Sequence, residues 1–244
     1  MISFSFKNKI VLVTGGSKGI GKSICKDFFN SGANVYFTSR SKSEVLRKKN
    51  NFLKSIQVDF NDKESYSNFV EKINSIKKID ILINNAGMNK IDSIQNIKDK
   101  DWENILNLNL SIPFKLSRLI SKKMIKNKYG RIVNIGSIFS LISKEKRASY
   151  SSSKFGLIGL TKSSAHDLAN RGILVNAVSP GFVKTSLTKK ILSTNEIKKL
   201  SLTIPMKRMA SSNEITSCVL FLSSSANTYI TGQNILIDGG FSSK

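Results

Sequence analysis

The residues Thr14-Gly15-Gly16-Ser17-Lys18-Gly19-Ile20-Gly21 join a short apolar run, which begins at Ile10, to a segment with helical periodicity. Glycines at such a turn let the backbone approach a pyrophosphate closely, and the amides at the helix N-terminus meet its negative charge. The spacing, G-x-x-x-G-x-G, differs from the G-x-G-x-x-G fingerprint. The turn predicts a dinucleotide-binding site, with contacts from Gly15, Ser17, Lys18, Gly19, Ile20 and Gly21.

The same turn also fits a P-loop, because Gly16 precedes Gly21-Lys22-Ser23 at the required distance. A P-loop enzyme needs a magnesium-binding acid at the end of another strand, and the chain offers no convincing one. A glycine turn with a purely structural role is a further alternative. We favour the dinucleotide site because the second predicted strand ends on a residue suited to a nucleotide cofactor.

Short apolar runs bounded by turn residues alternate with helical patterns along the whole chain, which is typical of buried parallel strands in βαβ units. The pattern predicts a single-domain α/β fold over residues 1–244: a Rossmann-type, doubly wound parallel sheet of about seven strands with helices on both faces. The predicted strands are Ile10–Thr14, Val35–Ser39, Ser55–Asp59, Asp80–Asn84, Arg131–Gly136, Leu174–Ser179 and Asn234–Ile237. Predicted helices include one that ends near Gly32 and a long one over Trp102–Lys126.

Arg40 lies at the carboxyl end of the second predicted strand, where an acidic residue would bind the ribose 2′-hydroxyl of NAD. An arginine suits a 2′-phosphate instead, and Lys18 could add a second positive charge. We therefore expect NADP(H) to be preferred over NAD(H), with a plain surface cation as the alternative for Arg40.

Tyr150 and Lys154 are four residues apart, so on a helix they share one face, and Ser137 follows the strand Arg131–Gly136. A neighbouring ammonium favours the ionised form of a phenol, which makes the phenol a better proton donor near neutral pH. The chain's one histidine, His166, lies about 160° around the same predicted helix from Tyr150 and is expected to be structural.

These motifs together resemble those of the short-chain dehydrogenase/reductase family, over nearly the whole chain. The glycine turn is similar to the family's cofactor loop, Asn84-Asn85-Ala86-Gly87 to its fourth-strand motif, and Asp238-Gly239-Gly240 to its last conserved turn. The resemblance implies a catalytic tetrad of Asn109, Ser137, Tyr150 and Lys154.

The resemblance implies reduction of a carbonyl by hydride transfer from a nicotinamide, with Tyr150 as proton donor and Ser137 stabilising the developing negative charge. Lys154 would also bind the nicotinamide ribose, and Asn109 would hold a water in a proton relay. The further cofactor contacts that it implies, besides Tyr150 and Lys154, are Asp59, Phe60, Asn85, Ala86, Gly87, Pro180, Gly181, Val183 and Thr185.

Composition limits the other classes of function. No run of about 18 apolar residues is present, so no membrane span is expected, and the segment before the first strand is too short for a signal peptide. Two cysteines and one histidine supply neither a metal-ligand cluster nor a disulfide framework, so no metal is expected. A cytoplasmic location follows.

The formal net charge of +23 raises the question of nucleic-acid binding. The lysines are dispersed over the entire length without a basic arm, so no nucleic-acid partner is expected. An acidic carrier protein or an anionic substrate is compatible with this charge.

Within the family, the chain looks most like reductases of 3-oxoacyl groups on acyl carrier protein, and segment 184–210 carries apolar residues at helical spacing that suit a substrate lid. One departure is the charged stretch between Ser137 and Tyr150, which includes Lys144-Glu145-Lys146-Arg147 and could serve a sugar, a polyol or a polysaccharide precursor. A non-catalytic NADP-binding regulator is a remote alternative, because such a protein would be expected to lose Tyr150 or Lys154. The resemblance also implies a homotetramer.

Overall fold

The computed structural model describes residues 4–41, 45–185, 188 and 193–243. Its centre is one eight-stranded sheet, in the order β3-β4-β2-β1-β5-β6-β7-β8. The strands are β1 (Ile10–Val13), β2 (Asn34–Ser39), β3 (Leu46–Lys48), β4 (Asn51–Gln57), β5 (Ile81–Asn84), β6 (Gly130–Ile135), β7 (Ile173–Pro180) and β8 (Asn234–Ile237).

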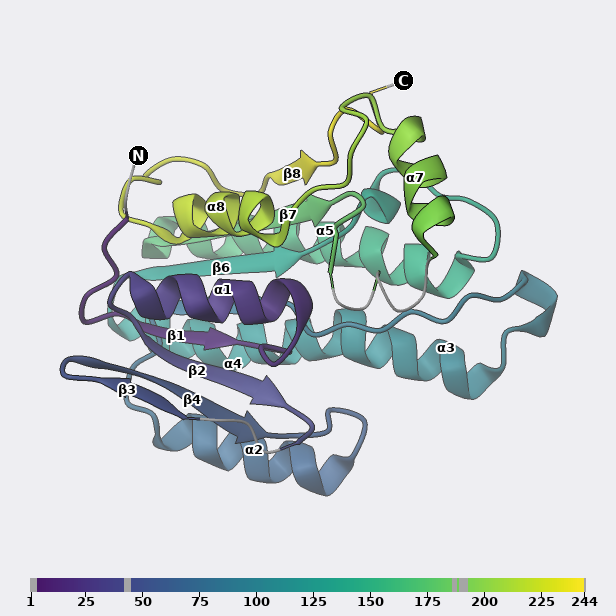
Figure 1. The fold of residues 1–244 in the computed structure, drawn as a ribbon. Coiled ribbons are helices and arrows are strands. Elements are labelled where there is room, and N and C mark those ends of the chain that lie inside the picture. The colour runs from purple at the N-terminus through teal and green to yellow at the C-terminus, as the bar shows by residue number, and fades with distance from the viewer. Residues whose placement is uncertain (1–3, 42–44, 186–187, 189–192, 244) are drawn as a thin grey trace.

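All strand pairs are parallel except β3 with β4. The crossover from β4 on one side of β1 to β5 on the other gives the doubly wound topology that the sequence predicts. Each of the seven predicted strands is present, so the predicted fold class is confirmed. Figure 1 shows that the parallel strands point the same way, so their carboxyl ends form one edge of the molecule.

Helices cover both faces of the sheet (Figure 1). On one face lie α1 (Gly19–Asn30) and α8 (Ser212–Ser223), and on the other lie α2 (Lys63–Ser75), α4 (Ile112–Lys126) and α5 (Ala148–Leu168). Two shorter stretches, α3 (Asp99–Leu106) and α7 (Thr194–Thr203), lie at the carboxyl side of the sheet.

The alternation of side chains along each strand builds the two cores. Val11 and Val13 of β1 belong to a buried cluster with Ile24 and Phe28 of α1. Leu12, between them, points to the opposite face and joins the cluster that includes helices α2 and α4. Because both faces are covered, the strands at the centre of the sheet are mostly apolar, which is why their sequence shows runs and not alternation.

Three features differ from the prediction by more than a one-residue shift of a strand end. The third predicted strand was Ser55–Asp59, whereas β4 spans Asn51–Gln57 and ends two residues before Asp59. The edge strand β3 was not predicted, and all three of its residues are exposed. The predicted helix over Trp102–Lys126 is interrupted by a π-helical turn at Asn107–Ser111.

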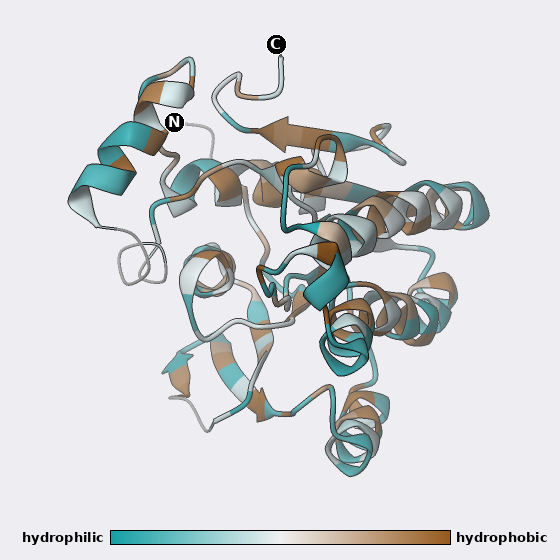
Figure 2. Cartoon of the chain, turned by 90° about the vertical axis from the view of Figure 1, so that its right-hand side faces the viewer, coloured by the Kyte–Doolittle hydropathy of each residue, from teal (hydrophilic) through white to brown (hydrophobic). Residues whose placement is uncertain are grey.

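Helix α7 confirms the helical spacing predicted from Ile197 and Leu200, and none of its residues is buried. Ile191 and Leu192, which belonged to the same prediction, lie outside the described residues. Figure 2, a quarter turn from Figure 1, shows α7 standing apart from the helices that cover the sheet. Among the described helices, none is long and apolar enough to cross a membrane.

Candidate active site

The carboxyl edge of the sheet gathers the predicted catalytic residues. Tyr150 and Lys154 lie one turn apart in α5, Ser137 follows the end of β6, and Asn109 lies in the π-helical turn before α4. His166 is also on α5 but is exposed, as its helical position predicts. The structure therefore brings together four residues that come from three separate parts of the sequence.

The glycine turn after β1 is fitted tightly against the loop that follows β5. Gly15 has φ +67°, which glycine adopts without strain. A Cβ on Gly21 would lie 2.2 Å from the Gly15 carbonyl oxygen and 2.5 Å from Nδ2 of Asn85, so only glycine fits there. This close approach puts the first turn of α1 directly behind the loop, where its amides can meet a phosphate.

Thr14 and Asn85 hold this turn to the neighbouring strand end. The Thr14 hydroxyl oxygen accepts hydrogen bonds from the backbone amides of Asn85 and Ala86, both at 2.9 Å. In return, Nδ2 of Asn85 donates to the carbonyl oxygens of Thr14 at 2.9 Å and Gly15 at 3.1 Å. The predicted cofactor residues of the two loops thus form one hydrogen-bonded unit.

Asn109 fixes the end of that unit nearest Tyr150. Its Oδ1 accepts from the Met88 amide at 2.9 Å, and its Nδ2 donates to the Met88 carbonyl at 2.9 Å and to the Ser153 hydroxyl at 3.0 Å. A Cβ on Gly87 would lie 3.2 Å from Asn109 Oδ1 and 3.8 Å from Nζ of Lys154. The Asn109 side chain therefore holds the loop of Gly87 and Met88 in place, whether or not it also binds a water.

Lys154 is a buried cation without an acidic partner among the described residues. Its Nζ donates to the Ile135 carbonyl oxygen at 2.7 Å, at the end of β6. Burial disfavours the charged form and lowers the pKa of Lys154 from 10.5 to about 8. Its other two donor hydrogens are available to a ligand, because an ammonium has three.

Tyr150 lies between two groups that favour its ionised form. Desolvation raises the pKa of the phenol above its usual value, while a hydrogen bond with Ser137 and the charge of Arg147 lower it. Nζ of Lys154 is 5.7 Å from the centre of the Tyr150 ring. The hydrogen bond with Ser137 and the charge of Arg147 oppose this desolvation, while Nζ of Lys154 donates to the Ile135 carbonyl oxygen; acidification of Tyr150 by Lys154 stays a prediction.

The residues predicted to bind the adenosine end of a cofactor lie around the carboxyl ends of β2 and β4. Arg40 and Lys18 are both exposed there. Asp59 lies beyond β4 and does not close it, and its Oδ1 accepts from the Asn61 amide at 3.0 Å. Phe60 is buried in the core, and its carbonyl oxygen accepts from Asn107 at 3.0 Å.

The loop after β7 reaches back to the glycine turn. A Cβ on Gly19 would lie 3.8 Å from Cγ2 of Thr185, so the two predicted contacts face each other. Val183 is buried and pairs with Ala210 in an isolated bridge. Pro180 closes β7, and a Cβ on Gly181 would lie 2.8 Å from Cα of Asp238. These contacts fit a cofactor that runs from the glycine turn towards Tyr150.

A family model described as short chain dehydrogenase matches residues 9–196, which contain the glycine turn, Asn109, Ser137, Tyr150 and Lys154. The chain belongs to the short-chain dehydrogenase family. It is 42% identical over 240 residues to 3-oxoacyl-[acyl-carrier-protein] reductase FabG of Buchnera aphidicola, covering 96% of this chain and 97% of the relative. The family membership predicted from the sequence motifs is confirmed.

Two solved structures of short-chain dehydrogenases extend the comparison. 4-Hydroxyisoleucine dehydrogenase complexed with NADH has a TM-score of 0.90 and 32% identity, over 97% of this chain and 100% of that one. ElxO with NADP bound has a TM-score of 0.87 and 32% identity, over 97% and 99%. The chain is an oxidoreductase of this family, whose reaction uses a nicotinamide dinucleotide, and the glycine-lined cradle at its carboxyl edge fits that group.

Arg147 was missed as a site residue, because in sequence it is one of several charged residues in a row. Its guanidinium carbon lies 5.7 Å from the centre of the Phe139 ring, whose own centre is 6.3 Å from that of Tyr150. The signal that could have drawn attention to it is its position three residues before Tyr150, on the same face of the helix start.

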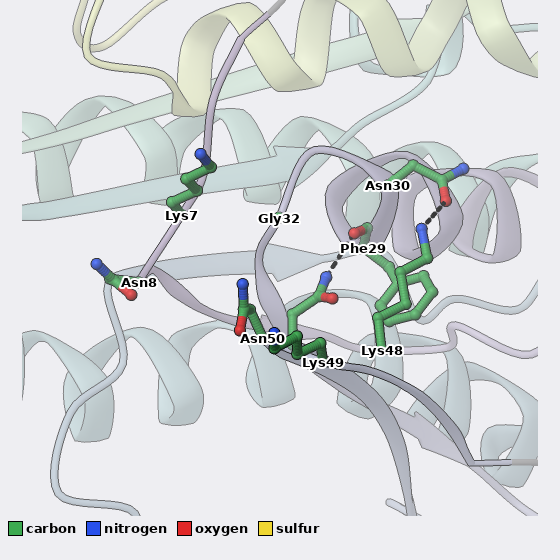
Figure 3. Close-up of a pocket in the computed structure, with 9 residues that line it drawn as sticks. Lys7, Asn8, Phe29, Asn30, Gly32, Lys48, Lys49 and Asn50 are labelled. Carbon is green, nitrogen blue, oxygen red and sulfur yellow. Dashed lines mark hydrogen bonds between the residues drawn. The ribbon is translucent and has the colours of Figure 1, made fainter.

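A surface cavity of about 530 Å³ lies elsewhere, at the amino edge of the sheet. Figure 3 shows Lys7, Phe29 and Lys48 around it, with Lys48 hydrogen-bonded to Asn30. No predicted catalytic or cofactor residue lines it. In its wall, Nδ2 of Asn51 donates hydrogen bonds to the carbonyl oxygens of Phe29 and Ala33, which satisfies acceptors at the carboxyl end of α1 and just beyond it.

Proposed function

We propose that this protein reduces the 3-oxo group of an acyl chain carried as a thioester on acyl carrier protein, using NADPH. The observation that carries the proposal is the full-length similarity to a 3-oxoacyl reductase together with the placement of Ser137, Tyr150 and Lys154 at one edge of the sheet. The similarity to 4-hydroxyisoleucine dehydrogenase favours a second candidate function, in which the substrate is a small hydroxylated molecule.

The reaction assigns one task to each residue. A bound reduced nicotinamide supplies the hydride that the carbonyl carbon accepts. Tyr150 gives its phenolic proton to the carbonyl oxygen, and the Ser137 hydroxyl donates a hydrogen bond to the same oxygen while negative charge develops on it. The products are an alcohol, the oxidised cofactor and a phenolate on Tyr150, which regains its proton through solvent.

Lys154 orients the cofactor in this scheme. Its position beside Gly87 and its spare donor hydrogens suit the two hydroxyls of the nicotinamide ribose. With the bond to the Ile135 carbonyl kept, a bound hydroxyl pair would use the remaining two donor hydrogens of the ammonium. Asn109 would remain the residue that holds the loop of Gly87 in place.

The preference for NADPH rests on charge. Arg40 follows β2 and Lys18 belongs to the glycine turn, and both side chains are exposed. A 2′-phosphate at the end of β2 would meet the planar, five-donor guanidinium of Arg40, whereas the uncharged 2′-hydroxyl of NADH would not.

The segment 184–210 is proposed to be the lid over the substrate. Helix α7 begins with a capping box, in which Ser193 and Glu196 exchange hydrogen bonds, and this box stabilises its first turn. Leu202 and Met206 are 57% and 58% exposed, which leaves apolar surface available to an acyl chain.

A tetramer built on α4 and α5 is part of the proposal. Phe114 on α4 and Phe155 on α5 are 45% and 46% exposed, so both helices present apolar surface outward. Light scattering of the purified protein would give its mass; a monomer at working concentration would contradict this assembly.

The function is tested by following NADPH oxidation with acetoacetyl-acyl carrier protein and with a panel of small hydroxyketones and keto-acids. We expect turnover of the carrier-bound thioester. Turnover of the small ketones alone would discard the acyl-carrier assignment and keep the reaction class. Turnover by neither, with NADPH still bound, would contradict the proposed function.

A further inference from the structure

Arg147 occupies the N-cap position of α5, next to the catalytic phenol. It lies one helical turn before Tyr150, and its guanidinium is stacked over Phe139, two residues beyond Ser137. The Phe139 amide donates to the Ser137 hydroxyl at 3.2 Å, which ties the ring to the serine. Ser137, Phe139, Arg147 and Tyr150 therefore form one packed group.

The guanidinium of Arg147 is charged and incompletely satisfied. Its Nε and Nη1 are buried and have no hydrogen-bond partner. No carboxylate of the described residues pairs with it. A buried donor without a partner destabilises the fold, so an acceptor or an anion within reach of Arg147 would relieve this cost.

Tyr150, one helical turn after Arg147, carries a phenol that can become an anion. Arg147 is the charged side chain that lowers the pKa of that phenol. Lys154, the other cation close to it, has a pKa of about 8 and donates to the Ile135 carbonyl. Lys154 therefore loses its charge in mildly alkaline solution, whereas a guanidinium keeps its charge at every pH in the working range.

We propose that Arg147 stabilises the negative charge that Tyr150 carries once it has given its proton to the substrate. The inference rests on the proposed function, because it requires Tyr150 to be the proton donor. Arg147 acts on the reaction through Tyr150, without bonding the substrate, and it supplies the permanent charge that Lys154 cannot.

The test compares the pH dependence of kcat for carbonyl reduction in Arg147→Gln, Arg147→Lys and the wild type. Without the cation the phenol keeps its proton to higher pH. The fall of kcat on the alkaline side of the pH profile should therefore occur about one pH unit higher in Arg147→Gln. Its kcat at neutral pH should fall about tenfold, because the phenol is a weaker acid. Arg147→Lys, which retains the charge, should have nearly the alkaline limb and the neutral-pH kcat of the wild type.

Two controls separate this charge effect from a structural one. Lys144→Gln removes an exposed cation from the same loop and should leave the limb in place. NADPH affinity, measured by fluorescence, should be unchanged in all three variants if the fold is intact. A fall in kcat with an unmoved alkaline limb, or a failure of Arg147→Lys to restore it, would overturn the proposal.

Tyr150→Phe distinguishes this failure from that of the proposed function. If Tyr150→Phe is inactive and Arg147→Gln has the pH profile of the wild type, only the role of Arg147 is wrong. If Tyr150→Phe retains turnover, Tyr150 is not the proton donor, and both the proposed function and this inference fall.

Discussion

Positive charge is held in opposite ways at the two edges of the parallel sheet. At the amino edge, Asp80 is buried, accepts a hydrogen bond from the Ile10 amide at 2.9 Å and pairs with Lys78 at 3.0 Å and Lys9 at 4.0 Å. Nearby Arg131 donates to backbone carbonyl oxygens at 2.9 Å. At this edge the cations surround a carboxylate.

At the carboxyl edge, Lys154 and Arg147 have no such carboxylate among the described residues. Desolvation of Lys154 is the reason for its lowered pKa. The difference indicates that the amino edge is organised for stability, while the carboxyl edge keeps its cations ready for a ligand and a phenolate. Substitutions at the two edges should therefore have opposite effects on stability and on turnover.

The largest difference should come from two tyrosines. Tyr150→Phe removes the proposed proton donor and should lower kcat about 10³-fold while NADPH still binds. Tyr129→Phe is the matched control, because Tyr129 lies at the amino edge with Lys9 over its ring. Steady-state kinetics would show equal losses in the two variants if the edges did not differ in function.

Replacement of the buried lysine should make the protein more stable. Below pH 8 the ammonium of Lys154 is charged in the folded and the unfolded states, so its desolvation penalty is present in full. Lys154→Met should then raise the free energy of unfolding by up to about 3 kcal/mol at pH 7, less the lost hydrogen bond to Ile135.

This gain should shrink as the pH rises from about 8 to 10.5, because the folded wild type loses its proton first and is relieved of the penalty. Urea unfolding at several pH values measures it. Lys162→Met changes an exposed lysine of the same helix and serves as the control. A Lys154→Met protein that is less stable than wild type at pH 7 would show that the ammonium stabilises the fold.

The reverse is expected at the amino edge. Asp80→Asn leaves Lys9 and Lys78 without their carboxylate and should lower the free energy of unfolding by about 2 kcal/mol, with kcat unchanged. Lys78→Gln removes a partly exposed partner and should cost less than about 1 kcal/mol. Thermal or urea unfolding compares them, and a large loss of kcat in Asp80→Asn would erase the contrast between the edges.

The smallest effect is expected at the surface of the carboxyl edge. Arg40→Asp should shift the ratio of kcat/KM for NADPH over NADH by about tenfold towards NADH, since it exchanges a phosphate partner for a hydroxyl acceptor. Lys26→Gln, an exposed change on α1, is the control. An unchanged ratio would assign the cofactor preference to residues other than Arg40.

The central strands were predictable because they are buried on both faces and therefore mostly apolar, whereas β4, with its exposed Lys54, was placed only in part. The edge strand β3 was not, since Leu46–Lys48 is short, charged and exposed, and its pairing with β4 depends on a turn that carries no strong signal. The glycine turn and the Tyr150–Lys154 pair were predictable from spacing, because spacing determines which residues share a turn or a face.

What sequence could not supply is the local environment of each charge. The four charged residues 144–147 look alike in sequence, yet Arg147 alone packs on Phe139. The bond from Lys154 to Ile135 joins residues on different elements, and the effect of the Arg147 charge on Tyr150 is likewise a product of the folded chain. Such contacts depend on tertiary packing, which neither periodicity nor composition reports.

The π-helical turn at Asn107–Ser111 contains one residue more than a regular α-helical path would need, so the number of residues in this segment matters. Deletion of a single residue there would let α3 continue into α4 as one regular helix, with better backbone hydrogen bonding and no change to the sheet. Because a π turn absorbs its extra residue, the flanking helices would stay aligned, whereas Asn109 within the turn would lose its place opposite Met88. A protein with the more regular helix should therefore be less active, so activity depends on the number of residues in this turn as well as on their types.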